Sequence, residues 1–124
     1  MSNENNEFGF NFENLEVYKK ALKFSIELCK IASKFPYAYS RLRDQLIGAA
    51  ISVPLNIAEG SGRFGKKEKV NFYKYGRASV FECIPIIEIS NELKLISDSE
   101  LYKYKKDSSE ISKMLNGLIR STIS

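Results

Sequence analysis

The chain has 124 residues, of which 44% are hydrophobic and 27% are charged, and this balance indicates one globular domain rather than a disordered or fibrous protein. Its 19 basic and 15 acidic residues leave a net charge of +4, which alone is too small to indicate a nucleic-acid-binding protein. The chain contains no histidine, which excludes Ser-His-Asp and Cys-His catalytic groups and His-ligated metal sites.

The sequence carries no targeting or membrane signal. No run approaches the roughly 18 apolar residues that span a bilayer. The Asn- and Glu-rich start lacks the basic-then-apolar layout of a signal peptide. We therefore expect a cytoplasmic protein with no membrane association. Cys29 and Cys83 fall among apolar neighbours in helical patterns, and we expect them to be buried, reduced thiols.

The first helix follows a short N-terminal tail. Residues 1–11 are predicted to be flexible because they offer little to bury, and residues 12–124 are predicted to form the folded domain. The helix is expected from about Asn14, as its N-cap, to about Lys34, before Phe35-Pro36 ends it. It carries two apolar stripes: Leu15, Tyr18, Leu22, Ser25, Cys29 and Ala32, and Val17, Ala21, Phe24, Leu28 and Ile31.

The second helix is expected to begin with Ser40 as its cap and to continue to Glu59, with Gly60 as the left-handed residue that ends it. It has no charged side chain between Gln45 and Ala58. Because it is apolar on two opposite sides, we expect one side to pack in its own bundle and the other to contact a second subunit. The first side comprises Leu42, Leu46, Ala49, Ala50, Val53 and Ile57, the second comprises Ile47, Ile51, Pro54 and Ala58, and a narrow polar strip of Gln45, Gly48, Ser52, Asn56 and Glu59 lies between them.

The third helix is expected from about Lys66 to Leu95, with small residues in its packing seam. A hairpin of the second and third helices about Gly62 would bring small residues opposite small ones and polar residues opposite polar ones. The predicted pairs are Ala49 with Gly76, and Gln45 with Ser79.

The fourth helix is expected to begin after a capping box, Ser97-Asp98-Ser99-Glu100. Four helices with short connections predict an all-α, antiparallel up-down-up-down four-helix bundle. We expect this bundle to assemble as a homo-oligomer through the second helix. The seam of the fourth helix consists of Leu101, Tyr104, Ser108, Ile111, Leu115 and Leu118.

Several stretches of the sequence form a specific pattern: Phe12-Glu-Asn-Leu-Glu-Val-Tyr-Lys-Lys-Ala21, Phe35-Pro36, Gln45, Ser52-Val-Pro-Leu-Asn-Ile-Ala-Glu-Gly60 and Arg63. This pattern closely resembles the four-helix-bundle protein family that is encoded in intervening sequences of bacterial large-subunit ribosomal RNA. The family includes the accessory variability protein of diversity-generating retroelements. The resemblance covers about residues 12–120 and implies a homopentamer with no known catalysis. In the retroelement branch it also implies binding to nucleic acid and to a reverse transcriptase.

The chain departs from that family's pattern at two places. Leu46-Ile47-Gly48 stands where relatives usually carry one or two arginines, which removes a basic contribution from this part of the second helix. Gly76-Arg77-Ala78-Ser79 stands where relatives tend to have Ala-x-Gly-Ser, and we expect the same close packing.

The polar strip of the second helix has two interpretations. Asn56 and Glu59 lie one turn apart and could serve acid-base chemistry in a ligand pocket. Alternatively, Ser52 and Asn56 satisfy backbone groups near Pro54, while Glu59 pairs with Arg63. In the second interpretation the residues form a structural motif, which comprises Gln45, Ser52, Pro54, Asn56, Glu59 and Gly60.

The run from Arg63 to Arg77 contains six basic residues and one acidic residue. It could follow a phosphate backbone, with Tyr73 close enough to stack on a base, or it could be an ordinary solvated helix face. Lys103, Lys105 and Lys106 could extend this surface or only keep the fourth helix soluble. The predicted nucleic-acid-binding residues are Arg63, Lys66, Lys67, Lys69, Lys74 and Arg77.

Three carboxylates, Glu82, Glu88 and Glu92, raise the question of a metal site inside the bundle, but di-iron bundles use Glu-x-x-His pairs and the chain has no histidine. We therefore expect no metal, no cofactor and no enzymatic activity. The sequence predicts a homo-oligomer, which the family resemblance implies is a pentamer, that binds structured RNA or RNA/DNA. The alternative is a protein-interaction scaffold for a partner such as a reverse transcriptase or a ribosome-associated factor.

Overall fold

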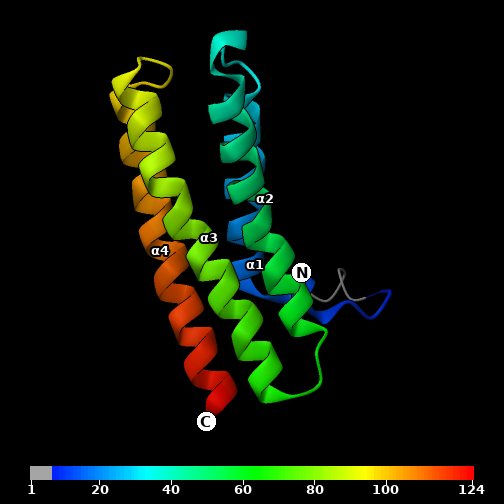
Figure 1. The fold of residues 1–124 in the computed structure, drawn as a ribbon. Coiled ribbons are helices and arrows are strands. Elements are labelled where there is room, and N and C mark those ends of the chain that lie inside the picture. The colour runs from blue at the N-terminus through cyan, green and yellow to red at the C-terminus, as the bar shows by residue number, and fades with distance from the viewer. Residues whose placement is uncertain (1–6) are drawn as a thin grey trace.

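A computed structural model describes residues 7–124, and the prediction of an all-α protein with four helices is confirmed (Figure 1). The 3₁₀ turn η2 (Asn11–Asn14) precedes α1 (Glu16–Ala32), and the 3₁₀ turn η3 (Tyr37–Tyr39) precedes α2 (Ser40–Ser61). Helices α3 (Lys66–Glu92) and α4 (Asp98–Ile123) complete the fold. The predicted flexible tail falls partly on residues 1–6, which lie outside the described part.

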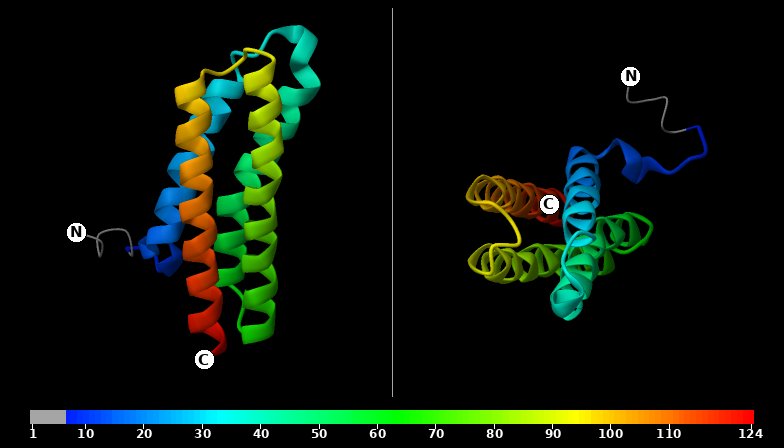
Figure 2. Two further views of the ribbon diagram at one scale, coloured as in Figure 1. Left: turned by 90° about the vertical axis from the view of Figure 1, so that its left-hand side faces the viewer. Right: turned by 90° about the horizontal axis from the view of Figure 1, so that it is seen from above.

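Each helix runs opposite to the one before it, so the chain rises along α1 and α3 and descends along α2 and α4 (Figure 1). Helix α1 contacts α2 and α4, and α3 also contacts α2 and α4, as in a four-helix bundle. From above, α3 and α4 lie side by side, with α1 and α2 next to them (Figure 2).

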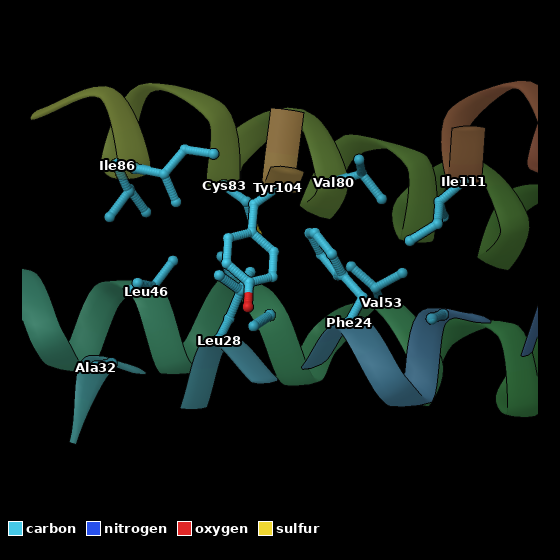
Figure 3. Close-up of a cluster of buried hydrophobic side chains, with 14 of the residues drawn as sticks. Phe24, Leu28, Ala32, Leu46, Val53, Val80, Cys83, Ile86, Tyr104 and Ile111 are labelled. Atoms are coloured by element: carbon cyan, nitrogen blue, oxygen red, sulfur yellow. The ribbon is translucent and has the colours of Figure 1, made fainter. Parts of the chain in front are cut away.

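The core lies between the α1/α2 pair and the α3/α4 pair (Figure 3). Phe24 and Leu28 of α1 point toward Val80 and Cys83 of α3, because their apolar stripes recur at helical spacing. Polar side chains in the core are satisfied locally. The buried serines Ser79, Ser90 and Ser108 each donate a hydrogen bond to the carbonyl four residues earlier in their own helix.

The two predicted stripes of α1 have different environments. Val17, Ala21, Phe24 and Leu28 are buried in the core, as expected of the inner stripe. In the other stripe Leu22 is exposed and Cys29 is half-buried. The predicted N-cap at Asn14 is wrong. Asn14 ends the 3₁₀ turn and Leu15 follows in an extended conformation, so the Asn14 side chain makes no capping bond.

Both predicted caps of α2 are wrong. Ser40 is the first helical residue and caps nothing, because the turn η3 leads directly into the helix. Gly60 does not end α2, because its φ is not positive and the helix continues through it to Ser61. Gly60 serves close packing instead, since a Cβ placed there would lie 2.8 Å from Cε1 of Tyr73.

The predicted register of α2 against α3 is also wrong. Gly76 faces Val53 and Asn56 rather than Ala49, and Ser79 Oγ lies 2.8 Å from Ser52 Oγ rather than near Gln45. The chain reverses between Gly62 and Gly65 rather than about Gly62 alone, which moves the partners of α3 toward the C-terminal end of α2. Ser79 contacts a residue seven positions, or about two turns, beyond Gln45, and Gly76 contacts residues four and seven positions beyond Ala49.

The ends of α3 and α4 show how local backbone chemistry sets the boundaries. Helix α3 ends at Glu92, before the predicted Leu95, because Lys94 adopts φ 65° and Leu95 N–H donates to Ser90 O over 2.8 Å, which is a Schellman motif. The predicted capping box of α4 is confirmed, with Glu100 N–H donating to Ser97 Oγ and Ser97 N–H donating to Glu100 Oε1.

The two cysteines are free thiols. Cys83 is buried as predicted, and burial raises the pKa of its thiol to about 12. Cys29 is only half-buried, and burial again raises its pKa above the ordinary value.

Candidate nucleic-acid interface

The predicted basic segment begins at the turn between α2 and α3. Lys66 and Lys67 form the first turn of α3 and are exposed. The N-terminal end of a helix carries a partial positive charge from its unpaired backbone N–H groups, so the two ammonium groups add to a potential that is already positive.

Two of the predicted basic residues are engaged within the fold. Arg63 Nη2 donates to Glu59 Oε2 over 2.6 Å, and the Arg63 guanidinium lies 4.7 Å from the centre of the Phe72 ring. Lys69 Nζ donates to Ser61 O over 2.9 Å. These contacts hold the α2/α3 turn, so Arg63 and Lys69 are less available to a ligand than the sequence predicted.

The remaining two, Lys74 and Arg77, line a groove of about 510 Å³ between α3 and α4. Arg77 Nη1 donates to Asn116 Oδ1 of α4 over 2.6 Å, which fixes the guanidinium across the groove. Lys74 is exposed beside it. The groove is lined by Lys74, Arg77, Ala78, Phe81, Ser112 and Asn116.

Helix α4 adds two cations that the sequence analysis missed. Lys113 and Arg120 do not line the groove but are exposed on α4, Lys113 next to Ser112 and Arg120 one turn beyond Asn116 along the helix. Neither segment that borders the groove, residues 69–81 and 111–124, contains an aspartate or a glutamate. The absence of acidic residues from 111–124 was visible in the sequence. It indicates a basic surface only once the pairing of α4 with α3 is known.

The cations around the groove carry uncompensated charge. In residues 7–124, no carboxylate lies within ion-pair distance of Lys74, Arg77, Lys113 or Arg120. Two other lysines of α4 differ in this respect. Lys105 pairs with Glu88 of α3, and Lys103 pairs with Asp107 and with Glu27 of α1. The cations of the groove instead stand in segments that hold no acidic residue.

Tyr73, which the sequence suggested as a stacking partner for a base, is buried with only 3% of its surface exposed. Its ring packs against Gly60, and its hydroxyl lies 3.2 Å from Ser61 Oγ. This suggestion is wrong, because the Tyr73 side chain points into the bundle. The aromatic side chain that does face the basic groove is Phe81, with 57% of its surface exposed.

The polar strip of α2 lies in a separate, shallow groove against α3. Asn56 Nδ2 donates to Ser52 O over 2.8 Å and to Ser52 Oγ over 2.9 Å, and Ser52 in turn pairs with Ser79. Pro54 is buried, whereas Gln45 is exposed and takes no part in this network. Ser52, Asn56 and Glu59 thus meet in one place, with contacts that suit the structural interpretation of the motif.

A third feature is an apolar groove of about 610 Å³ between α1 and α2. Four large apolar side chains at this groove are exposed, which is unusual on the surface of a small monomer. Leu55 is exposed over 63% of its surface. The exposed members are Leu22, Ile26, Ile51 and Leu55, and the lining also includes Phe12, Tyr18 and Pro54.

Within residues 7–124, no three acidic or thiol side chains come together in a way that would hold a metal ion. Glu88, one of the three carboxylates considered above, pairs with Lys105. No helix in this same range is long and apolar enough to cross a membrane.

Comparison with known proteins connects this architecture to a family. The model of the 23S rRNA-intervening sequence protein family matches residues 13–117. The chain belongs to this family. The resemblance recognised from the Asn-Ile-Ala-Glu-Gly motif is thereby confirmed for the 23S rRNA-intervening sequence proteins, while the link to the retroelement branch stays a prediction.

A solved structure has the same fold. It is the crystal structure of a protein of unknown function from the S23 ribosomal protein family of Bacteroides thetaiotaomicron. Its TM-score is 0.74 at 19% sequence identity, and the alignment covers 83% of the present chain and 97% of the other. No curated protein matches the chain. The 23S rRNA-intervening sequence fold is therefore shared at low sequence identity.

Proposed function

We propose that this protein is a non-enzymatic homo-oligomer of antiparallel four-helix bundles that binds nucleic acid through the α3/α4 groove. The observation that carries the proposal is a set of four cations on the two helices that form the groove, none of which has an ion-pair partner in residues 7–124. Lys74 and Arg77 line the groove, and Lys113 and Arg120 are exposed on α4 within one turn of its lining residues. Membership in a family named after an intervening sequence of ribosomal RNA supports RNA as the ligand.

The expected affinity of one chain is modest and depends strongly on salt. Each phosphate that a cation neutralises releases a condensed counterion, and the logarithm of the binding constant falls by about 0.9 per phosphate for each tenfold rise in salt. If all four cations contact phosphates, the affinity of one chain should fall on the order of a hundredfold between about 50 and 200 mM salt.

Assembly would turn this weak surface into a strong one. The apolar groove between α1 and α2 leaves Leu22, Ile26, Ile51 and Leu55 in water, and a second copy of the chain would cover them. A ring of five copies, as the family resemblance implies, presents five basic grooves to one nucleic acid, so that binding at the first groove raises the effective concentration at the others.

Nucleic-acid binding is tested with a fluorescently labelled, structured RNA and an RNA/DNA hybrid, titrated at several salt concentrations. The double variant K74E/K113E reverses one exposed charge on each side of the groove and should abolish binding at moderate salt. The matched control K34E/K94E makes the same change at the other end of the bundle, where α1 and α3 end, and should bind nearly as well as the wild type. Equal loss of nucleic-acid affinity in both double variants would refute a localised site.

Assembly is tested by light scattering at micromolar concentration. The wild type should have a mass five times that of one chain, and L55E should dissociate the assembly because it places a charge in the apolar groove. A wild-type mass equal to one chain would refute the oligomer.

The same apolar groove favours a second candidate function, a scaffold on which a protein partner docks. A reverse transcriptase or a ribosome-associated factor would then be recovered with the tagged protein, and nuclease treatment would not reduce its recovery. L55E should abolish this recovery, whereas K74E/K113E should leave it unchanged.

A further inference from the structure

Phe81 occupies an unusual position beside the basic groove. It lies one helical turn beyond Arg77 on α3, and more than half of its surface is exposed. A single exposed apolar side chain is common on a protein surface and by itself indicates no contact. At Phe81, however, the groove adds cationic and polar groups to the apolar Ala78, namely Lys74 and Arg77 on its own helix and Ser112 and Asn116 on α4.

This combination of an aromatic face and neighbouring cations suits a nucleotide. Proteins that bind single strands hold the phosphates with basic side chains and stack the bases on aromatic rings. The groove measures about 510 Å³, within the range of roughly 300 to 1,000 Å³ that is usual for small-molecule sites. The amide of Asn116 accepts from Arg77 through Oδ1, so its Nδ2 group can donate to a ligand in the groove.

We propose that the α3/α4 groove holds an unpaired nucleotide, whose base stacks on Phe81 while Lys74 and Arg77 contact its phosphate. The inference rests on the proposed nucleic-acid binding and specifies its ligand as a single-stranded or looped segment. A base within a duplex has both faces covered by its neighbours and cannot reach a side chain that stands on a helix surface. The site therefore distinguishes unpaired from paired RNA.

Three variants of Phe81 separate stacking from other roles. F81L keeps an apolar side chain of similar size but removes the ring, and should weaken binding of a short single-stranded oligouridine by about tenfold. Its affinity for a duplex of equal length should stay within about twofold, because the phosphate contacts remain. F81W should bind the single strand at least as tightly as the wild type, and F81A should resemble F81L.

F81W also provides a direct signal, because the chain contains no other tryptophan. Stacking of a base on the indole should quench its fluorescence when the oligonucleotide binds, and a duplex should cause little quenching. Y37L is the matched control. It removes an aromatic ring that is 89% exposed in the turn η3, at the other end of the molecule, and should leave both affinities unchanged.

The outcomes are distinguishable. Selective loss of single-strand affinity in F81L, with quenching in F81W, supports the inference. The inference fails if F81L binds the single strand like the wild type, or if it loses affinity for the single strand and the duplex equally. The proposed nucleic-acid binding stands in both cases. If F81A lowers the mass measured by light scattering while F81L leaves the assembly intact, Phe81 contacts another copy of the chain and the inference also fails. Absence of any nucleic-acid binding by the wild type overturns both proposals.

Discussion

Replacement of Gly60 by alanine tests why the glycine of the Asn-Ile-Ala-Glu-Gly motif is required. A Cβ at this position would lie 2.8 Å from Cε1 and 3.0 Å from Cδ1 of Tyr73, and 3.1 Å from the carbonyl oxygen of Lys69. Carbon atoms pack at about 3.5 to 4.0 Å, so the Tyr73 ring would have to move by nearly 1 Å. The ring cannot move freely, because it is buried and its hydroxyl lies 3.2 Å from Ser61 Oγ.

The expected cost of Gly60→Ala follows from three effects. Overpacking a tight site costs about 1 to 3 kcal/mol, and disturbance of the contact between Tyr73 and Ser61 costs about 1 kcal/mol. The better helix propensity of alanine returns about 1 kcal/mol. We therefore expect the free energy of unfolding to fall by about 2 kcal/mol, which for a chain of this length lowers the Tm by about 8 °C.

Thermal unfolding followed by circular dichroism measures this change, at one fixed protein concentration because assembly makes the Tm depend on concentration. Gly117→Ala in α4 is the control. A Cβ there would meet nothing closer than Arg120 Nη2 at 3.8 Å, so only the gain in propensity remains, up to about 1 kcal/mol. If Gly60→Ala melts at or above the wild-type temperature, as Gly117→Ala should, the packing explanation of the motif is refuted.

Further predictions concern the polar strip, the buried thiol and the fourth helix. Asn56→Leu removes both hydrogen bonds to Ser52 and should lower the free energy of unfolding by about 1 to 2 kcal/mol in urea titrations; intact stability with loss of an activity would favour a ligand pocket instead. Since burial raises the pKa of the Cys83 thiol to about 12 from its ordinary 9.0, the thiol should resist alkylation at pH 8 until the protein unfolds. The raised pKa also means that its contribution to stability is complete below pH 9.0 and is lost as the pH rises toward 12, which urea midpoints on both sides of this interval would reveal. Ser97→Ala removes the cap of α4 and should cost about 1 kcal/mol in the same assay, whereas equal stability would mean that Glu100 alone holds the helix start.

Features of the fold could be predicted from the sequence where neighbouring residues alone determine them. The capping box at Ser97 needs only neighbouring residues, and it was predicted correctly. The buried stripe through Phe24 and Leu28 follows from helical periodicity. The end of α2 could not be predicted in this way. Gly60 suits either a left-handed cap or a close contact, and only the presence of the Tyr73 ring opposite it decides between the two.

The candidate site was predictable only in part, because it is built from two distant segments. The basic run of α3 identified Lys74 and Arg77, but the same run included Arg63, which pairs with Glu59, and Lys69, whose ammonium group donates to the carbonyl of Ser61. Whether Tyr73 or Phe81 faces solvent depends on where the bundle axis lies relative to α3. The contribution of α4, with Arg120 and its neighbours, depends on the pairing of helices and not on any local motif.

The buried serines have a consequence for how the helices are aligned. The Ser90 and Ser108 hydroxyls donate to carbonyls of their own helices, so they need no hydrogen-bond partner on a neighbouring helix. The hydroxyl pair of Ser52 and Ser79 is different, since it joins α2 to α3 at a fixed height. Together with the hydroxyl contact of Ser61 and Tyr73, this pair sets the height of α2 against α3 and so positions the polar strip of α2.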